Sequence, residues 1–93
     1  MVVGLLTLEL QLPGCDTLKE KRHRLKGVIE RARARFNVSA AEVDLQNARD
    51  SAVVAVSMVN SERSLVEKVL TKVEELFDNG DGILITASTF EWL

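Results

Sequence analysis

The chain has few of the residues that build redox, disulfide-stabilised or membrane-spanning structures. Its 93 residues include one cysteine, one histidine, one proline and no tyrosine. A single cysteine can form neither an internal disulfide nor a cysteine-rich zinc site, which fits a reducing compartment. No apolar run approaches the ~18 residues of a membrane helix, and the first residues lack the basic and apolar segments of a signal peptide. We therefore expect a single domain, residues 1–93, in the cytoplasm.

What the sequence does contain is an ordered series of strand and helix patterns. Apolar residues fall on every second position from Leu6 to Leu12, which predicts a strand over 2–12 with one buried face. Thr17 and Glu20 have the form of a capping box and predict a helix over 18–36. Segments 38–46 and 51–59 predict a hairpin. A second amphipathic helix should then end at the Asn79-Gly80-Asp81-Gly82 cluster, before a last strand over 82–93.

This βαββαβ order predicts an α+β fold of the ferredoxin-like kind. Right-handed crossovers place both helices on one face of a four-stranded antiparallel sheet. The other sheet face is then uncovered, and a second subunit or a nucleic acid can pack there. Leu84, Phe90 and Trp92 alternate on one face of the last strand, and we expect that face to belong to the core rather than to the open side.

Positive charge is concentrated in the first predicted helix. Residues 19–35 hold eight Lys or Arg against two Glu, a net charge of +6, whereas the rest of the chain holds four Lys or Arg against twelve acidic residues. At about 100° per residue, the basic side chains lie on the two flanks of the apolar stripe, with Gly27 on the solvent face. One flank holds Lys19, Arg22, Lys26 and Arg33, and the other holds Lys21, Arg24, Arg31 and Arg35. Such a helix can bind phosphates, although a solvated helix face is the simpler interpretation.

Patterns for catalysis or cofactor binding are missing. The sequence contains no glycine-rich phosphate loop and no nucleophile elbow. Cys15 has no neighbouring base, and His23 is expected at the surface. Glu42 and Asp44 alternate in the second strand, but two carboxylates are a weak cation site and are better explained as solvated edge charges. We predict a protein that is not an enzyme and binds neither metal nor cofactor.

Four ordered segments carry a resemblance to a known family. They are residues 1–6 (MVVGLL), 18–22 (LKEKR), 35–39 (RFNVS) and 41–44 (AEVD). Through them the chain resembles the YlxP-like family of small bacterial proteins of unknown function. The resemblance implies a ferredoxin-like fold, a bacterial cytoplasm and, from the genes that often lie beside those of the family, a connection with RNA or the ribosome. The family tends to carry His and then Trp after the last of these segments, whereas this chain reads LQNAR, so no role of that hairpin is carried over.

We therefore predict an accessory protein that binds structured RNA, on the ribosome, through the basic first helix. Arg49 in the hairpin adds a further phosphate contact. Readout of bases is not expected, because the first and third predicted strands lack the aromatic residues on which RNA-recognition domains of this fold stack bases. The alternative is a homodimeric protein-interaction or small-ligand module that uses the open sheet face. A third hypothesis is an enzyme that uses Cys15 or the pair Glu42 and Asp44.

Overall fold

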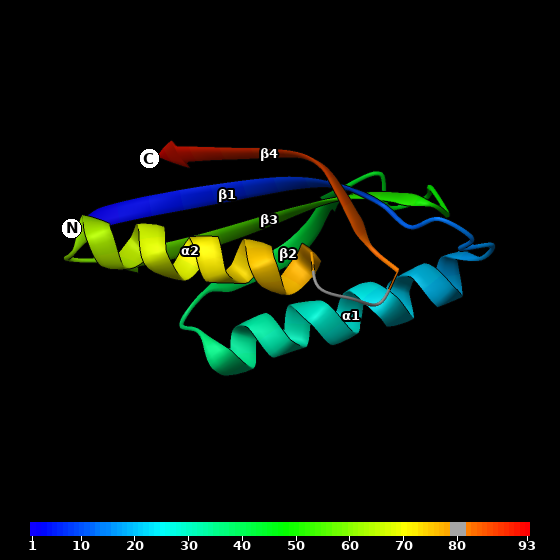
Figure 1. Cartoon of the computed structure of the whole chain (residues 1–93), viewed down its shortest axis with the longest axis horizontal. Coiled ribbons are helices and arrows are strands. Elements are labelled where there is room, and N and C mark those ends of the chain that lie inside the picture. Colours follow the sequence, from blue (N-terminus) through cyan, green and yellow to red (C-terminus); the bar gives the residue numbers. More distant parts are fainter. Residues whose placement is uncertain (79–81) are drawn as a thin grey trace.

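The computed structural model, which describes residues 1–78 and 82–93, has the predicted ferredoxin-like architecture. Its elements are β1 (Val2–Gln11), α1 (Leu18–Arg35), β2 (Ser39–Asp44), β3 (Ser51–Asn60), α2 (Arg63–Asp78) and β4 (Leu84–Trp92). The strands form one antiparallel sheet in the order β2-β3-β1-β4, and both helices cover the same face of it (Figure 1). Of the cluster predicted to end the second helix, residues 79–81 lie outside the described residues.

The local signals in the sequence account for where α1 begins and which side of it is buried. Thr17 has an extended backbone, and its hydroxyl accepts a hydrogen bond of 3.1 Å from the Glu20 amide, as the capping pattern predicts. Leu25, Val28 and Ala32 recur at helical spacing and are buried. On the opposite side of α1, His23, Glu30 and Ala34 are exposed.

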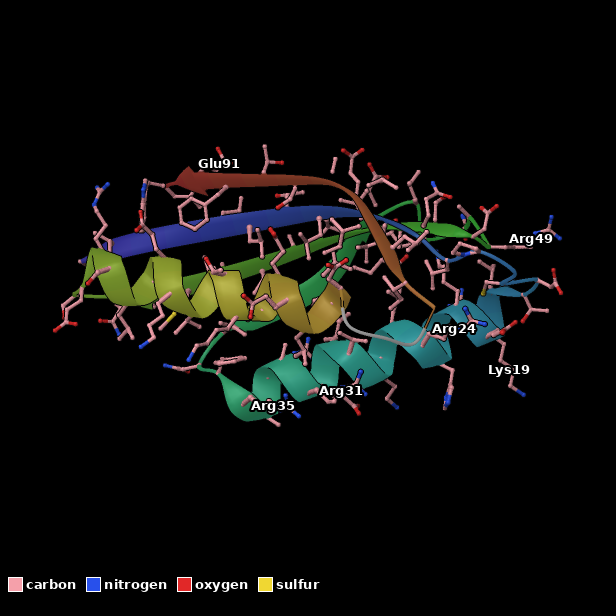
Figure 2. The ribbon with its side chains drawn as sticks, viewed as in Figure 1. Lys19, Arg24, Arg31, Arg35, Arg49 and Glu91 are labelled. Atoms are coloured by element: carbon pink, nitrogen blue, oxygen red, sulfur yellow. The ribbon has the colours of Figure 1, made fainter. Side chains whose placement is uncertain are left out.

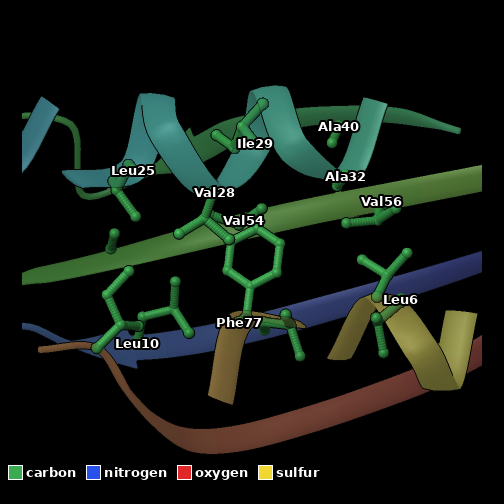
Figure 3. Close-up of a cluster of buried hydrophobic side chains, with 14 of the residues drawn as sticks. Leu6, Leu10, Leu25, Val28, Ile29, Ala32, Ala40, Val54, Val56 and Phe77 are labelled. Carbon is green, nitrogen blue, oxygen red and sulfur yellow. The ribbon is translucent and has the colours of Figure 1, made fainter. Parts of the chain in front are cut away.

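The core lies between the helices and the covered sheet face. Leu6, Leu8 and Leu10 of β1 alternate toward the helices and are almost fully buried. Phe77 of α2 is fully buried in the centre of this layer, among side chains from α1, β1 and β3 (Figure 3). Cys15 is also part of the core, with 5% of its surface exposed.

A close approach between α2 and β1 depends on Gly4. A Cβ atom at this position would lie 2.6 Å from Cγ1 of Val66 and 3.0 Å from Cδ1 of Leu70. Since real Cβ atoms do not approach other carbons so closely, the glycine allows α2 to lie directly on the strand.

The prediction that Leu84 shares a face with Phe90 and Trp92 is wrong. Phe90 pairs with Leu6 and therefore faces the helices, where it is 40% exposed. The register shifts between Glu9 and Leu10, and this irregularity inserts one extra residue into β4. Leu84 consequently lies on the open face, 55% exposed.

Candidate nucleic-acid interface

The outward side of α1 carries most of the predicted basic residues. Six of them are exposed and Arg24 is partly exposed; we call these seven the basic face of α1: Lys19, Arg22, Arg24, Lys26, Arg31, Arg33 and Arg35. Figure 2 labels four of them along the helix, with Arg49 in the hairpin at the same end of the molecule as Lys19. Arg49 is exposed as well. The structure therefore brings seven of the eight predicted residues onto one elongated surface.

One flank of this surface borders β2. Arg22, Lys26 and Arg33 line a shallow groove between α1 and this strand, together with Ala41 and other residues. The Arg33 guanidinium donates a hydrogen bond to the backbone oxygen of Ala40, which holds this guanidinium at the groove. The flank predicted from helical spacing is thus preserved in the fold.

On the other flank, Arg24 is held in place next to Gly82, which lies just before β4. Its Nη2 lies 2.6 Å from Oε1 of Glu20, one turn earlier in the helix, and its side chain is 25% exposed. Its Nη1 would lie 2.9 Å from a Cβ atom at Gly82, so the guanidinium packs directly on that glycine. This contact joins residues 58 positions apart in the sequence, and no local pattern indicates it.

The placement of Lys21 on the basic surface is wrong, because this side chain is completely buried. Its ammonium donates to the backbone oxygens of Leu45 at 2.9 Å, Ser51 at 3.1 Å and Gln46 at 3.4 Å. It also forms an ion pair of 2.8 Å with Glu42. Lys21 therefore ties α1 to the β2–β3 hairpin and is not available to a phosphate. The signal was present in the sequence, since the position lies four residues before Leu25 on the apolar stripe.

Glu42 and Asp44 do not form the pair that their alternation suggested. Glu42 pairs with Val54 across the strands and faces the helix side, where it meets Lys21. The register shifts between Glu42 and Asp44, so Asp44 pairs with Val53 and its carboxylate accepts from the Leu45 amide at 2.7 Å. In the part of the chain that the structure describes, no group of three or more His, Cys, Asp or Glu is suitably placed for a metal ion.

The single thiol and the single imidazole have different environments. The Cys15 thiol is buried and lies 3.5 Å from the backbone oxygen of Thr17. His23 is exposed on α1, as predicted from its position in the helix. Among residues 1–78 and 82–93, no helix is long and apolar enough to cross a membrane.

The open sheet face differs sharply in charge from the helix side. Its side chains form three rows across the strands: Glu91, Leu5, Ser57 and Ser39; Thr89, Thr7, Ala55 and Ala41; Ala87, Glu9, Val53 and Asp44. These rows contain three carboxylates and no Lys or Arg. Positive charge is thus concentrated on α1, on the far side of the molecule from Glu91 (Figure 2).

Comparison with known proteins places the chain in a family. The family described as "Protein of unknown function (DUF503)" matches residues 3–89. The chain belongs to this family. The Bacillus subtilis (strain 168) "Uncharacterized protein YlxP" is 31% identical over 91 residues, which cover 98% of this chain and 99% of that protein. The resemblance expected from the sequence is therefore confirmed for this DUF503 chain.

A solved structure was also found to be similar, at low identity. It is the "Full extracellular region of zebrafish Gpr126/Adgrg6", with a TM-score of 0.39 and 13% identity. The match covers 99% of this chain and 13% of that much longer one.

Proposed function

We propose that this DUF503 protein is a non-enzymatic accessory protein that binds structured RNA, on the ribosome, through the basic face of α1. The observation that carries the proposal is the segregation of charge. Seven Lys and Arg side chains lie on the outward side of one 18-residue helix, whereas the open sheet face presents carboxylates. A polyanion is attracted to the first surface and repelled by the second.

The ion pairs that α1 forms within residues 1–78 and 82–93 leave Lys26 and Arg24 able to bind phosphates. Lys26 and Glu30 are 4.0 Å apart and their side chains are 74% and 60% exposed, so their contact is a weak surface pair. Arg24 pairs more tightly with Glu20, but a guanidinium has five N–H donors, so others remain for a ligand. The ion pair of the buried Lys21 ammonium is with Glu42, whose side chain is 17% exposed, and Lys21 is not part of the basic face.

The geometry also indicates how the RNA is read. Phosphate contacts fix position and carry no sequence information, and stacking of bases requires exposed aromatic rings. The rows of the open face contain none. Phe90, which is 40% exposed, and Trp92 lie on the helix side of β4, beside α2 and its carboxylates and away from the basic face of α1. We therefore expect binding that depends on backbone shape and charge and varies little with base sequence.

The proposal is tested by two double variants that remove equal charge from different helices. Arg22→Gln with Lys26→Gln removes two charges from the basic face. Lys68→Gln with Lys72→Gln removes two exposed charges from α2. Binding to ribosomal subunits and to an RNA hairpin is measured as a function of salt. The first pair should flatten the slope of log affinity against log salt by about 1.4 to 1.8, at ~0.7 to 0.9 per lost phosphate contact. The second pair should leave it unchanged.

If the two double variants change the salt slope equally, the proposal is contradicted, since any exposed cation would then bind the RNA equally well. If the wild-type protein binds no RNA even at low salt, the basic face is a solvated surface. The alternative is then homodimerisation through the open sheet face, for which the partly buried Leu5 and Val53 supply apolar area. Light scattering distinguishes a dimer from a monomer directly.

A further inference from the structure

The strand β4 is an open edge of the sheet. It is the last strand in the order β2-β3-β1-β4, so one of its long sides pairs with β1 and the other pairs with no described strand (Figure 1). The Leu93 amide donates to the backbone oxygen of Val3, and in an antiparallel pair the direction of the backbone groups alternates along the strand. Ser88, Phe90 and Trp92 therefore direct their N–H and C=O groups away from β1.

Few of the features that protect an edge strand are present in β4. The opposite edge, β2, has 6 residues, two of them acidic, and a register shift between Glu42 and Asp44. In contrast, β4 has 9 residues, and its pairing with β1 is regular from Ala87 to Trp92. It contains no proline, and its one charged residue is Glu91. Since short length, charges, prolines and bulges keep edge strands from pairing, β4 is the edge to which a further strand can add.

A pocket beside this edge suits an apolar side chain. Its volume is about 280 Å³, and Leu6, Leu70 and Phe90 line it together with Glu67 and Glu74 of α2. Phe90 faces the helix side but is still 40% exposed. An added strand would place every second side chain on this side of the sheet, next to Phe90. Apolar residues at those positions would cover the ring and remove apolar surface from water.

The open side of the same edge is negatively charged. Glu91 is exposed on β4, Glu9 follows on β1, and the rows of the open face contain no Lys or Arg. An added strand is therefore favoured when its side chains on this side are Lys or Arg. Arg63 lies 4.5 Å from the Trp92 ring, on the helix side, where the added side chains are apolar. The β4 strand of a second copy would bring Glu91 and no cation, so charge favours a basic strand over a second copy.

We propose that β4 binds an extended segment of another protein in which apolar and basic residues alternate. The backbone of this segment bonds to Ser88, Phe90 and Trp92, its apolar side chains face α2, and its basic side chains face Glu91. In such strand addition, main-chain hydrogen bonds give affinity and alternate side chains give specificity. Because Glu91 lies on the far side of the molecule from α1 (Figure 2), the inference goes beyond RNA binding and does not depend on it.

Three peptides without tryptophan test the proposal, with the fluorescence of Trp92 in β4 as the signal. KVKLKVK has the proposed alternation. KKVLVKK has the same composition without the alternation, and EVELEVE keeps the alternation with the opposite charge. KVKLKVK should bind about tenfold more tightly than either of the others. Equal binding of KVKLKVK and KKVLVKK would show attraction by charge alone, and no binding of KVKLKVK, or tighter binding of EVELEVE, would likewise overturn the inference.

Variants of β4 separate the backbone contribution from the charge. Ser88→Pro removes an N–H that faces away from β1, so it breaks no hydrogen bond within the sheet, and it should weaken KVKLKVK binding about tenfold. Ser88→Ala loses the same hydroxyl contact with Glu74 but keeps the N–H, and should leave binding unchanged. Glu91→Lys should weaken KVKLKVK about threefold to tenfold and strengthen EVELEVE. This exposed substitution keeps the backbone intact and decides the question if Ser88→Pro fails to fold.

Amide hydrogen exchange identifies the edge directly. In the free protein the amides of Ser88, Phe90 and Trp92 should exchange faster than those of Thr89 and Glu91, and KVKLKVK should slow the first three. If they are already slow and light scattering shows a dimer, a second copy occupies the edge and the inference is overturned. RNA binding without any effect of the peptide overturns the inference alone, whereas peptide binding without RNA binding contradicts the proposed function alone.

Discussion

Replacing Lys21 with methionine should destabilise the protein strongly, although lysine is usually a surface residue. Methionine keeps most of the side-chain volume but removes the ammonium. Three backbone oxygens in the β2–β3 hairpin then lose the ammonium as a donor, although that of Leu45 still accepts from the Ala48 amide, and Glu42 loses its partner. Breaking a buried ion pair from one side costs about 3–5 kcal/mol. Glu42 retains 17% exposure and some access to water, so we expect a value near 3 kcal/mol.

This cost is a large part of the total stability expected for a domain of 93 residues, roughly 5–14 kcal/mol. Urea unfolding measures it, with the fluorescence of the single tryptophan, Trp92, and far-UV circular dichroism as independent probes. For a urea m-value of about 1.5 kcal/mol/M, the midpoint should fall by about 2 M.

A matched control and a second variant separate the parts of this effect. Lys26→Met removes an ammonium from the same helix at a site that is 74% exposed, and should change stability by less than about 0.5 kcal/mol. Adding Glu42→Gln to Lys21→Met should recover about 1–2 kcal/mol by removing the unpaired carboxylate, but not the rest. If Lys21→Met is as mild as Lys26→Met, the reasoning about the buried ammonium is refuted.

Three further outcomes follow from the packing. Gly4→Ala should lower the free energy of unfolding by about 1–3 kcal/mol, because the added methyl group would overlap Val66 and Leu70. Urea unfolding measures this loss, and a neutral result would contradict the close approach of α2 to β1. Phe77→Ala should lower the free energy of unfolding by about 3–5 kcal/mol in the same assay, since the ring is fully buried. A loss below about 1 kcal/mol would show that this ring lies outside the core. The Cys15 thiol should react with a thiol reagent slowly in the native protein and rapidly in denaturant, whereas fast native reaction would show an accessible thiol.

The order of elements was predictable from the sequence because each element carries its own local signal. The alternation in β1 and the Thr17 cap gave the limits of the first strand and helix, and right-handed crossovers then left the ferredoxin-like arrangement. The positions of Leu84 and of Asp44 could not be derived in this way. The position of each residue depends on a register shift in the sheet. Such a shift moves side chains to the other face, and no local sequence pattern indicates it.

The candidate site was predictable in part for the same physical reason. Helical spacing alone places seven cations outside the core, and the structure agrees for each of them. Lys21 was misplaced because a charged residue was assumed to face water, whereas hairpin carbonyls and Glu42 from distant positions surround it. The contact of Arg24 with Gly82 could not be predicted, since Gly82 lies far from α1 in the sequence.

The central claim, that the basic face of α1 binds RNA, is tested most directly by the salt dependence of wild-type binding to a structured RNA hairpin. If four or more of its seven cations contact phosphates, the slope of log affinity against log salt should be about −3 or steeper. A slope shallower than about −1, or no binding at low salt, would contradict the claim and leave α1 a solvated helix.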